Sequence, residues 1–176
     1  PMRKIPLSKV FISDEIKQKV LQVIDSEQYI LGPNCAAFEQ ELASYIGTQH
    51  CVLASNWTAA VHMLLLAMKL KPGDEVLVPS LTAFPTIEPV VHAGARPVFV
   101  DIDDSFTMDP DAAAAAITPR TVGIIPVHLY GHAADLGRLM PLAQKKNLWL
   151  IEDCAQAHGS TFSGKTSEVS EDFGSL

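Results

Sequence analysis

Hydrophobic positions in the first fifty residues repeat at the spacing of amphipathic helices. Ser13 is a suitable N-cap, and apolar residues recur over 16–24 at intervals of three and four. A second helix is expected after the Gly32-Pro33 pair, with Asn34 as its N-cap and Gly47 where a helix commonly ends. The pattern therefore predicts two helices before the first strand.

After residue 50, short apolar runs alternate with helical ones. The expected strands are 51–54, 75–78, 97–100, 122–127 and 148–151. The expected helices are 58–70, a proline-interrupted segment ending at 93, 109–117 and 134–146. Uniformly apolar strands between helices are typical of a mainly parallel sheet that helices sandwich on both faces. We expect one α/β domain in which one edge of the sheet carries Thr58, Ser80, His128 and Asp153.

The composition indicates a folded, acidic protein. Of the 176 residues, 48% are hydrophobic and 19% are charged, and the formal net charge is −7. Because no basic run exceeds a pair, we expect no nucleic-acid partner. The three cysteines lie in no CxxC arrangement, which suggests neither a disulfide framework nor a zinc site. No apolar stretch follows the charged start of the chain, and the longest one, Ala59 to Ala67, is interrupted by His62 and is about half of a membrane span. We therefore expect a cytoplasmic protein without membrane contact.

Polar residues follow the expected strands, where open parallel sheets bind their ligands. The turn Ser55-Asn56-Trp57-Thr58 precedes a helix, whose unpaired amide groups favour a phosphate. The alternative is that Ser55 or Asn56 only caps the helix. Asp153 follows four apolar residues, so its carboxylate needs a partner or has a raised pKa. That partner is either a protonated ring nitrogen or a backbone amide of the next turn.

Five segments occur in a fixed order: Ser55-Asn56-Trp57-Thr58-Ala59-Ala60, Pro72-Gly73-Asp74-Glu75-Val76, Pro97-Val98-Phe99-Val100-Asp101-Ile102-Asp103, Pro126-Val127-His128-Leu129-Tyr130-Gly131 and Glu152-Asp153-Cys154-Ala155-Gln156-Ala157-His158-Gly159. Together they resemble the DegT/DnrJ/EryC1/StrS aminotransferases, from about Pro6 to Leu176. The resemblance implies the aspartate-aminotransferase type of fold (fold type I), with 1–176 as an incomplete large domain that binds pyridoxal 5′-phosphate (PLP). It also implies a homodimer that transfers an amino group from glutamate or glutamine onto a nucleotide-linked keto-sugar.

The same resemblance assigns roles to single residues. Asp153 would bind the pyridine nitrogen of PLP, and Gln156 would contact the side of the ring that carries the phenolic oxygen. Thr58 and Ala59 would hold the phosphate through backbone and hydroxyl groups.

Two histidines also lie near the site in the family pattern. His128 and His158 would either take a direct part or be structural, as buried histidines at strand ends often are. The pair His128 and His132 is four residues apart, but Gly131 intervenes and the first lies at a strand end, so we expect no metal site.

Three features depart from the family pattern. Trp57 stands where a small residue is common, so the turn must accommodate a bulky side chain where the phosphate approaches. The aromatic residue that stacks on the cofactor ring falls at Ala83, and the neighbouring Phe84 is its candidate substitute. The Schiff-base lysine is expected just beyond Leu176, so no catalytic residue is assigned within the chain, which alone is expected to be inactive.

Two alternatives to an aminotransferase are open. One is a non-catalytic family member that binds PLP or a sugar nucleotide as a regulator. The other is a P-loop nucleotide-binding protein, because residues 159–166 read Gly-Ser-Thr-Phe-Ser-Gly-Lys-Thr. A P-loop requires a strand that runs directly into its first glycine and a helix that begins at its Lys-Thr pair. We expect instead a turn at Gly164-Lys165 between short extended segments.

Overall fold

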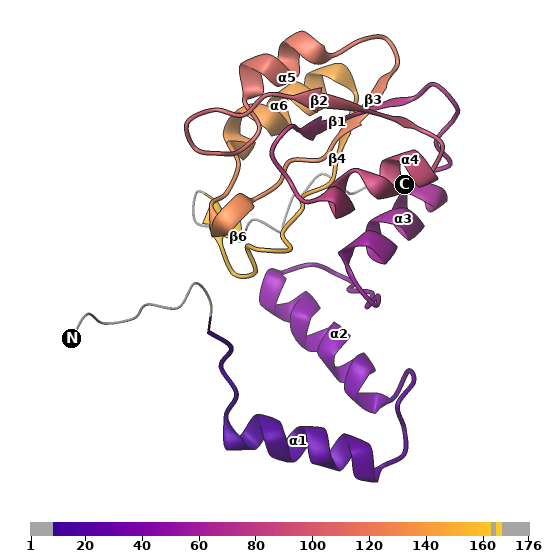
Figure 1. The fold of residues 1–176 in the computed structure, drawn as a ribbon, viewed down its shortest axis with the longest axis vertical. Coiled ribbons are helices and arrows are strands. Elements are labelled where there is room, and N and C mark those ends of the chain that lie inside the picture. The colour runs from indigo at the N-terminus through magenta and orange to yellow at the C-terminus, as the bar shows by residue number, and fades with distance from the viewer. Residues whose placement is uncertain (1–8, 163–164, 167–176) are drawn as a thin grey trace, which may run out of the picture.

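The computed structural model describes residues 9–162 and 165–166 (Figure 1). Its α-helices are α1 (Asp14–Asp25), α2 (Pro33–Ile46), α3 (Trp57–Ala67), α4 (Glu88–His92), α5 (Pro110–Ala116) and α6 (Leu136–Lys146). Two 3-10 turns are η1 (Phe84–Thr86) and η2 (Leu129–Gly131). The strands are β1 (Glu75–Pro79), β2 (Arg96–Val100), β3 (Thr121–Ile124), β4 (Trp149–Leu150), β5 (Thr161–Phe162) and β6 (Lys165–Thr166). Within these described ranges, no helix has the length and apolar character needed to cross a bilayer.

The central sheet has the order β2-β1-β3-β4, and all its pairs are parallel. In the register, Leu77 of β1 lies beside Val98 of β2 and Ile124 of β3. The chain thus places its second strand on one side of β1 and its third strand on the other. The expected parallel α/β sheet is confirmed, with each predicted strand after residue 70 present at nearly its expected position.

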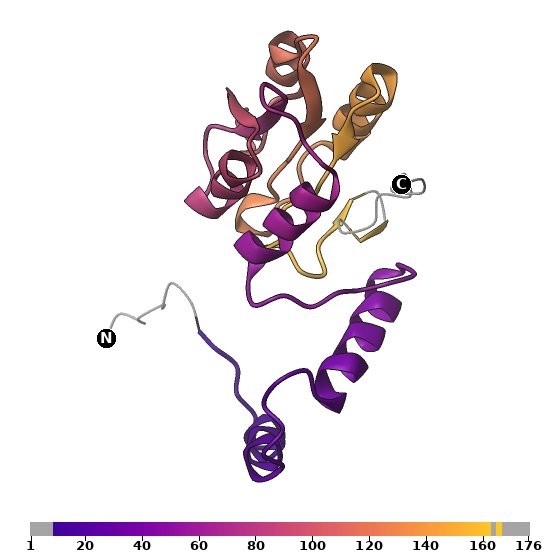
Figure 2. The same ribbon diagram turned by 90° about the vertical axis from the view of Figure 1, so that its right-hand side faces the viewer.

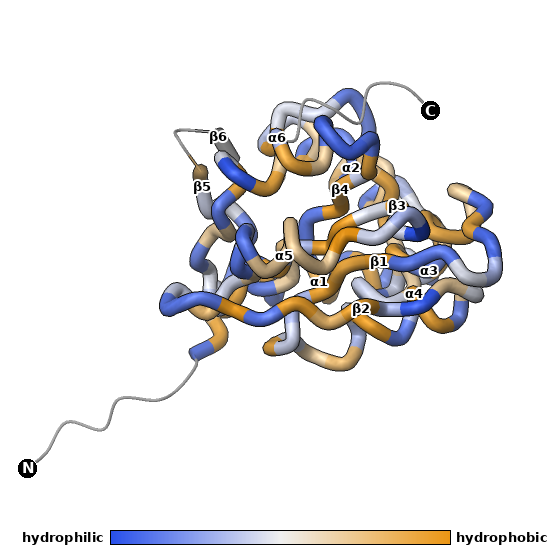
Figure 3. Tube along the Cα trace, turned by 90° about the horizontal axis from the view of Figure 1, so that it is seen from above, coloured by the Kyte–Doolittle hydropathy of each residue, from blue (hydrophilic) through white to orange (hydrophobic). Residues whose placement is uncertain are grey.

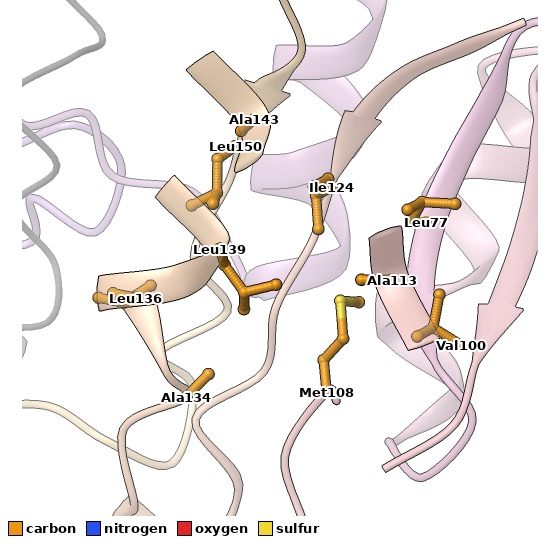
Figure 4. Close-up of a cluster of buried hydrophobic side chains, with 10 residues drawn as sticks. All are labelled: Leu77, Val100, Met108, Ala113, Ile124, Ala134, Leu136, Leu139, Ala143 and Leu150. Atoms are coloured by element: carbon orange, nitrogen blue, oxygen red, sulfur yellow. The ribbon is translucent and has the colours of Figure 1, made fainter. Parts of the chain in front are cut away.

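Helices cover both faces of this sheet, and alternate residues of β1 enter two separate cores. Leu77 belongs to a cluster with side chains from α5 and α6 (Figure 4), whereas Val76 and Val78 pack with side chains from α3 and α4. The strands form an apolar band in the middle of the molecule (Figure 3). The side chains of Val76, Leu77 and Val78 are all fully buried, which explains the apolar run in the middle of β1.

Most of the predicted ends of α1 and α2 are confirmed. The Ser13 hydroxyl accepts a hydrogen bond from the Ile16 amide at 3.2 Å, and Gly47 ends α2 with a φ of 92°, in the left-handed region. The expected N-cap at Asn34 is wrong, because Gly32 is the N-cap and Pro33 already begins the helix. Proline suits this first position, since it has no amide hydrogen and its φ is already helical.

The strand expected at 51–54 is also wrong. These residues belong to no regular element and pair with no described strand, and Val52 is 78% exposed. The Leu53 amide donates to Oε1 of Glu39 at 2.9 Å, so a side chain of α2 takes the place of a neighbouring strand. A strand requires such a neighbour, which an apolar run cannot specify by itself.

Helices α1 and α2 extend away from the layered part of the molecule (Figure 2). The helix α1 has no buried residue, and its apolar positions Ile16, Val20 and Ile24 are 41%, 54% and 53% exposed. The amphipathic pattern therefore predicted the helix correctly, although no described residue buries its apolar face.

Candidate functional site

The parallel pairing brings the segments that follow three strands to one edge of the sheet. Ser80 follows β1, and its amide donates to the Val100 carbonyl of β2 at 2.7 Å. Beyond β3 and β4, an isolated parallel bridge pairs Val127 with Asp153. This is also where the strand order reverses, between β1 and β3, which is the usual ligand position in open α/β sheets. Ser80, His128 and Asp153 therefore share the edge expected for them.

Asp153 is held firmly by its backbone and by its side chain. Its amide donates to the Pro126 carbonyl at 2.9 Å, and its own carbonyl accepts from the His128 amide at 3.0 Å. The side chain is accessible only slightly, because the residue is 4% exposed. One carboxylate oxygen, Oδ1, accepts from the Ala155 amide at 3.1 Å, and the other, Oδ2, accepts from the Thr86 hydroxyl at 2.8 Å.

Burial is the main influence on the ionisation of Asp153, and it raises the pKa of this carboxyl. The hydrogen bond from Thr86 and then the hydrogen bond from the Ala155 amide oppose it, and a positive charge on the His128 ring would act in the same direction. A partly desolvated carboxylate at a ligand-binding edge favours a cationic partner. The capping role that the sequence left open for Asp153 is also present, because Oδ1 accepts a hydrogen bond from the Ala155 amide in the next turn.

His128 is completely buried, and both of its ring nitrogens are used within the protein. Nδ1 accepts from the Ala134 amide at 2.9 Å, so in the neutral ring the proton is on Nε2, which lies 2.9 Å from Oε2 of Glu152. Cys154 lies close enough to complete a His-Glu-Cys cluster, with all ligand atoms within 4.8 Å. The Ala134 bond leaves the neutral ring without a lone pair for a metal ion. The geometry therefore favours the structural role of His128.

The turn before α3 forms a capped helix N-terminus. Asn56 is the N-cap, and its Oδ1 accepts from the Ala59 amide at 2.9 Å. The Trp57 side chain packs against the core cluster beneath α3, so its bulk is directed into the core. Its Nε1 is buried and has no hydrogen-bond partner among the described residues. Thr58 and Ala59 are half-buried in the first turn of the helix.

Gln156 and Phe84 are exposed residues in the segments that follow β4 and β1. The Gln156 side chain is anchored, because its Oε1 accepts from the Tyr130 amide at 2.9 Å. Tyr130 is a non-glycine residue with a φ of 57°, so the backbone adopts a strained conformation at this contact. Phe84 is the first residue of η1 and is 68% exposed. His158 is also exposed.

Sequence reasoning missed Thr86, the side-chain partner of Asp153. The two residues are 67 positions apart, and Thr86 lies in the segment that leads from β1 to α4. The only local signal was that two hydroxyl residues, Thr82 and Thr86, are four apart directly after a buried strand. Local spacing cannot show which strand end such a hydroxyl faces.

The P-loop alternative is excluded by the backbone around its lysine. Lys165–Thr166 forms strand β6, which pairs antiparallel with β5, whereas a P-loop requires a helix at this point. The two short extended segments are present, but Lys165 was expected in the turn between them and instead belongs to strand β6, where it pairs with Phe162. Residues 163 and 164 lie outside the described ranges.

The comparisons with known proteins agree with the family resemblance of the five sequence segments. The model of the DegT/DnrJ/EryC1/StrS aminotransferase family matches residues 11–175. A UDP-N-acetyl-3-dehydro-alpha-D-glucosamine 3-aminotransferase of Acidithiobacillus ferrooxidans is 46% identical over 155 residues, which are 88% of this chain and 42% of the relative. A UDP-2-acetamido-2-deoxy-3-oxo-D-glucuronate aminotransferase of Pseudomonas aeruginosa is 42% identical over 157 residues, which are 89% of this chain and 44% of the relative.

Solved structures agree with the fold. The crystal structure of NtdA from Bacillus subtilis with bound cofactor PMP has a TM-score of 0.84 and 34% identity, and the match covers 94% of this chain and 40% of NtdA. The chain spans less than half the length of the relatives that it matches. The family match over nearly all of its residues, together with the confirmed sheet, shows that this chain belongs to the DegT/DnrJ/EryC1/StrS aminotransferase family.

Proposed function

We propose that the full-length protein is a PLP-dependent aminotransferase that transfers an amino group from glutamate or glutamine to a nucleotide-linked keto-sugar. The observation that carries the proposal is the buried, hydrogen-bonded carboxylate of Asp153 at the ligand-binding edge of the sheet. The printed names of the two relatives support the substrate class, since both name a UDP-linked sugar with an oxidised carbon at position 3.

Asp153 would bind the protonated pyridine nitrogen of the cofactor. The carboxylate already has one protein donor on each oxygen, and it can accept further hydrogen bonds because it offers about four lone-pair positions. An ion pair with the pyridine nitrogen would offset the cost of burying the carboxylate. When bound, PLP supplies an electron sink for the carbon whose proton is removed.

The N-terminus of α3 would hold the phosphate group of the cofactor. The dipole and unpaired amides of a helix N-terminus attract an anion, and Thr58 adds a hydroxyl. The Asn56 cap uses the Ala59 amide, so phosphate binding at that amide would compete with the cap. The site residues therefore fit a phosphate, with Asn56 as the group that must yield or share.

Gln156 and Phe84 would complete the cofactor site. Because the Tyr130 amide fixes Oε1 of Gln156, the amide nitrogen of that side chain is the group that can donate to the phenolic oxygen of the ring. Phe84 would take the place of the usual stacking aromatic.

The remaining parts of the proposal concern the whole protein. We propose that residues 1–176 are an incomplete PLP-binding large domain and that the lysine that binds the cofactor covalently lies just beyond Leu176. The full-length protein would be a cytoplasmic homodimer.

The test uses the full-length protein and its Asp153→Asn variant. PLP should give an absorbance band that survives dialysis and disappears on borohydride treatment. Glutamate or glutamine should convert this band to the aminated cofactor form, and the converted protein should aminate a UDP-linked 3-keto-sugar. The variant should lose most of this activity, because an amide cannot stabilise a protonated pyridine nitrogen.

The matched control is Asp104→Asn, which makes the same chemical change at an exposed turn position. It should retain wild-type turnover. Near-normal turnover of Asp153→Asn would disprove the role of Asp153. A wild-type protein that holds PLP but transfers no amino group from any donor would instead be a regulatory member of the family.

A further inference from the structure

We infer that Thr86 is a positioning residue, which keeps the Asp153 carboxylate ionised and oriented toward the cofactor nitrogen; this inference rests on the proposed function. Thr86 does not need to touch the cofactor itself. It would act through Asp153.

The direction of the Thr86 hydrogen bond is unambiguous. An ionised carboxylate only accepts, so the single hydroxyl proton of Thr86 is directed at Oδ2 of Asp153, over 2.8 Å. The oxygen of Thr86 lies 2.8 Å from the hydroxyl of Thr82, and because the Thr86 proton is already used, Thr82 must be the donor in that contact. Two hydroxyl groups in series therefore point toward Asp153.

The hydrogen bonds from Thr82 to Thr86 and from Thr86 to Asp153 lie in the buried part of the site. Thr86 is 1% exposed and Thr82 is half-buried, so water competes little with the hydrogen bond to Asp153. Hydrogen bonds in a low-dielectric interior are stronger than in water, and a hydroxyl that itself accepts a hydrogen bond becomes a better donor. Oδ1 is fixed separately by the Ala155 amide, so the carboxylate plane is held at both oxygens.

The electrostatic balance at Asp153 gives Thr86 its importance. Burial raises the pKa of the Asp153 carboxyl, and the Thr86 hydrogen bond is the largest influence that lowers it. The other titratable group that acts on Asp153 is His128, whose ring is hydrogen-bonded to Glu152. Without Thr86 the carboxyl would more readily take a proton, and a neutral carboxyl cannot hold a protonated pyridine nitrogen.

The first test measures Asp153 in the cofactor-free full-length protein. Infrared spectra recorded against pH follow the carboxyl of ¹³C-labelled aspartate, and the Asp153→Asn variant identifies its band. In Thr86→Val, which keeps the branched shape but loses the hydroxyl, the Asp153 band should titrate at higher pH than in the wild type. Thr86→Ser should restore the wild-type titration.

The matched control is Thr121→Val. Thr121 is another buried threonine, at the amino end of β3 on the opposite edge of the sheet, and its hydroxyl accepts from the Thr118 amide. Its loss should leave the Asp153 titration unchanged. If Thr86→Val and Thr121→Val both titrate as the wild type does, the inference is overturned.

The second test measures the cofactor in the full-length protein loaded with ¹⁵N-labelled PLP. The nitrogen resonance should move toward the unprotonated position in Thr86→Val, and amino transfer should slow by about tenfold, as expected for one lost hydrogen bond to a charged group. Thr82→Val should change both measurements in the same direction, but less. A slower Thr86→Val enzyme with an unchanged nitrogen resonance would show a merely structural role.

The two tests separate the inference from the proposed function. If the wild-type protein binds no PLP, the proposed function fails, and so does the role of Thr86 toward a cofactor. The infrared titration would still decide whether Thr86 controls the ionisation of Asp153.

Discussion

Arg120 holds the carboxylate of Glu75 with two nitrogens, Nε at 2.9 Å and Nη2 at 2.7 Å from Oε1. The Glu75 side chain is fully buried at the first position of β1, and it also binds Nη2 of Arg96 at 2.6 Å and the Thr118 hydroxyl at 2.6 Å. These donors, Thr118 and Arg120 first, lower the pKa of Glu75 to about 2. The cluster connects β1, β2 and the segment just before β3, at the edge of the sheet opposite Asp153.

We predict that Glu75→Gln destabilises the protein and makes its stability less dependent on pH. The pKa of Glu75 is lower in the folded protein than its ordinary value of 4.5, so its contribution is complete above pH 4.5 and is lost as the pH falls toward about 2. The melting temperature of the variant should be below that of the wild type at pH 7, and the gap should narrow below pH 4.5. A gap that stays constant across this range would contradict the prediction.

Gly123 leaves room for the indole of its strand neighbour. The two residues are register partners in β3 and β4, and a Cβ added at Gly123 would lie 2.1 Å from Cδ2 of Trp149. We predict that Gly123→Ala costs about 1–3 kcal/mol of the free energy of unfolding, since the core must shift to accommodate it. Denaturant unfolding measures the cost. In a Trp149→Leu background the same substitution should cost clearly less, and equal costs in both backgrounds would show that the indole is not the obstacle.

Two substitutions of Asn56 distinguish its role as the N-cap of α3 from the binding of a phosphate at the same helix end. We predict that Asn56→Ala lowers stability by about 1 kcal/mol because the Ala59 amide loses its acceptor. Asn56→Asp keeps an acceptor and should keep the stability, but its negative charge should weaken PLP binding by repelling the phosphate. Melting temperatures and PLP titrations of the full-length variants measure the two effects. Equal PLP affinity in the aspartate variant and the wild type would indicate that the phosphate binds elsewhere.

Most of the layered fold could be predicted from local signals in the sequence, because the helices and strands depend mainly on local physical chemistry. Ser13 caps α1 by bonding the amide of Ile16, only three residues further along the chain. The buried runs of β1 and β3 are apolar because both faces of each strand are covered. The place of Asp153 also followed from the sequence, because a charged residue directly after an apolar strand must lie at the end of that strand. Its position at the common edge needed only the rule that such sheets are parallel.

Which groups meet at that edge could be seen only in the folded structure. Residues 51–54 carry the pattern of a strand but have no described strand beside them, and pairing depends on a neighbour rather than on propensity. His128 was open to a direct or a structural role until the Ala134 amide and Glu152 were seen to use both ring nitrogens. Thr86 reaches Asp153 across 67 residues, and only the packing of the segment between β1 and α4 against the end of the sheet makes that contact. Hydrogen bonds between distant segments depend on the folded path of the backbone, which the spacing of residues along the chain does not record.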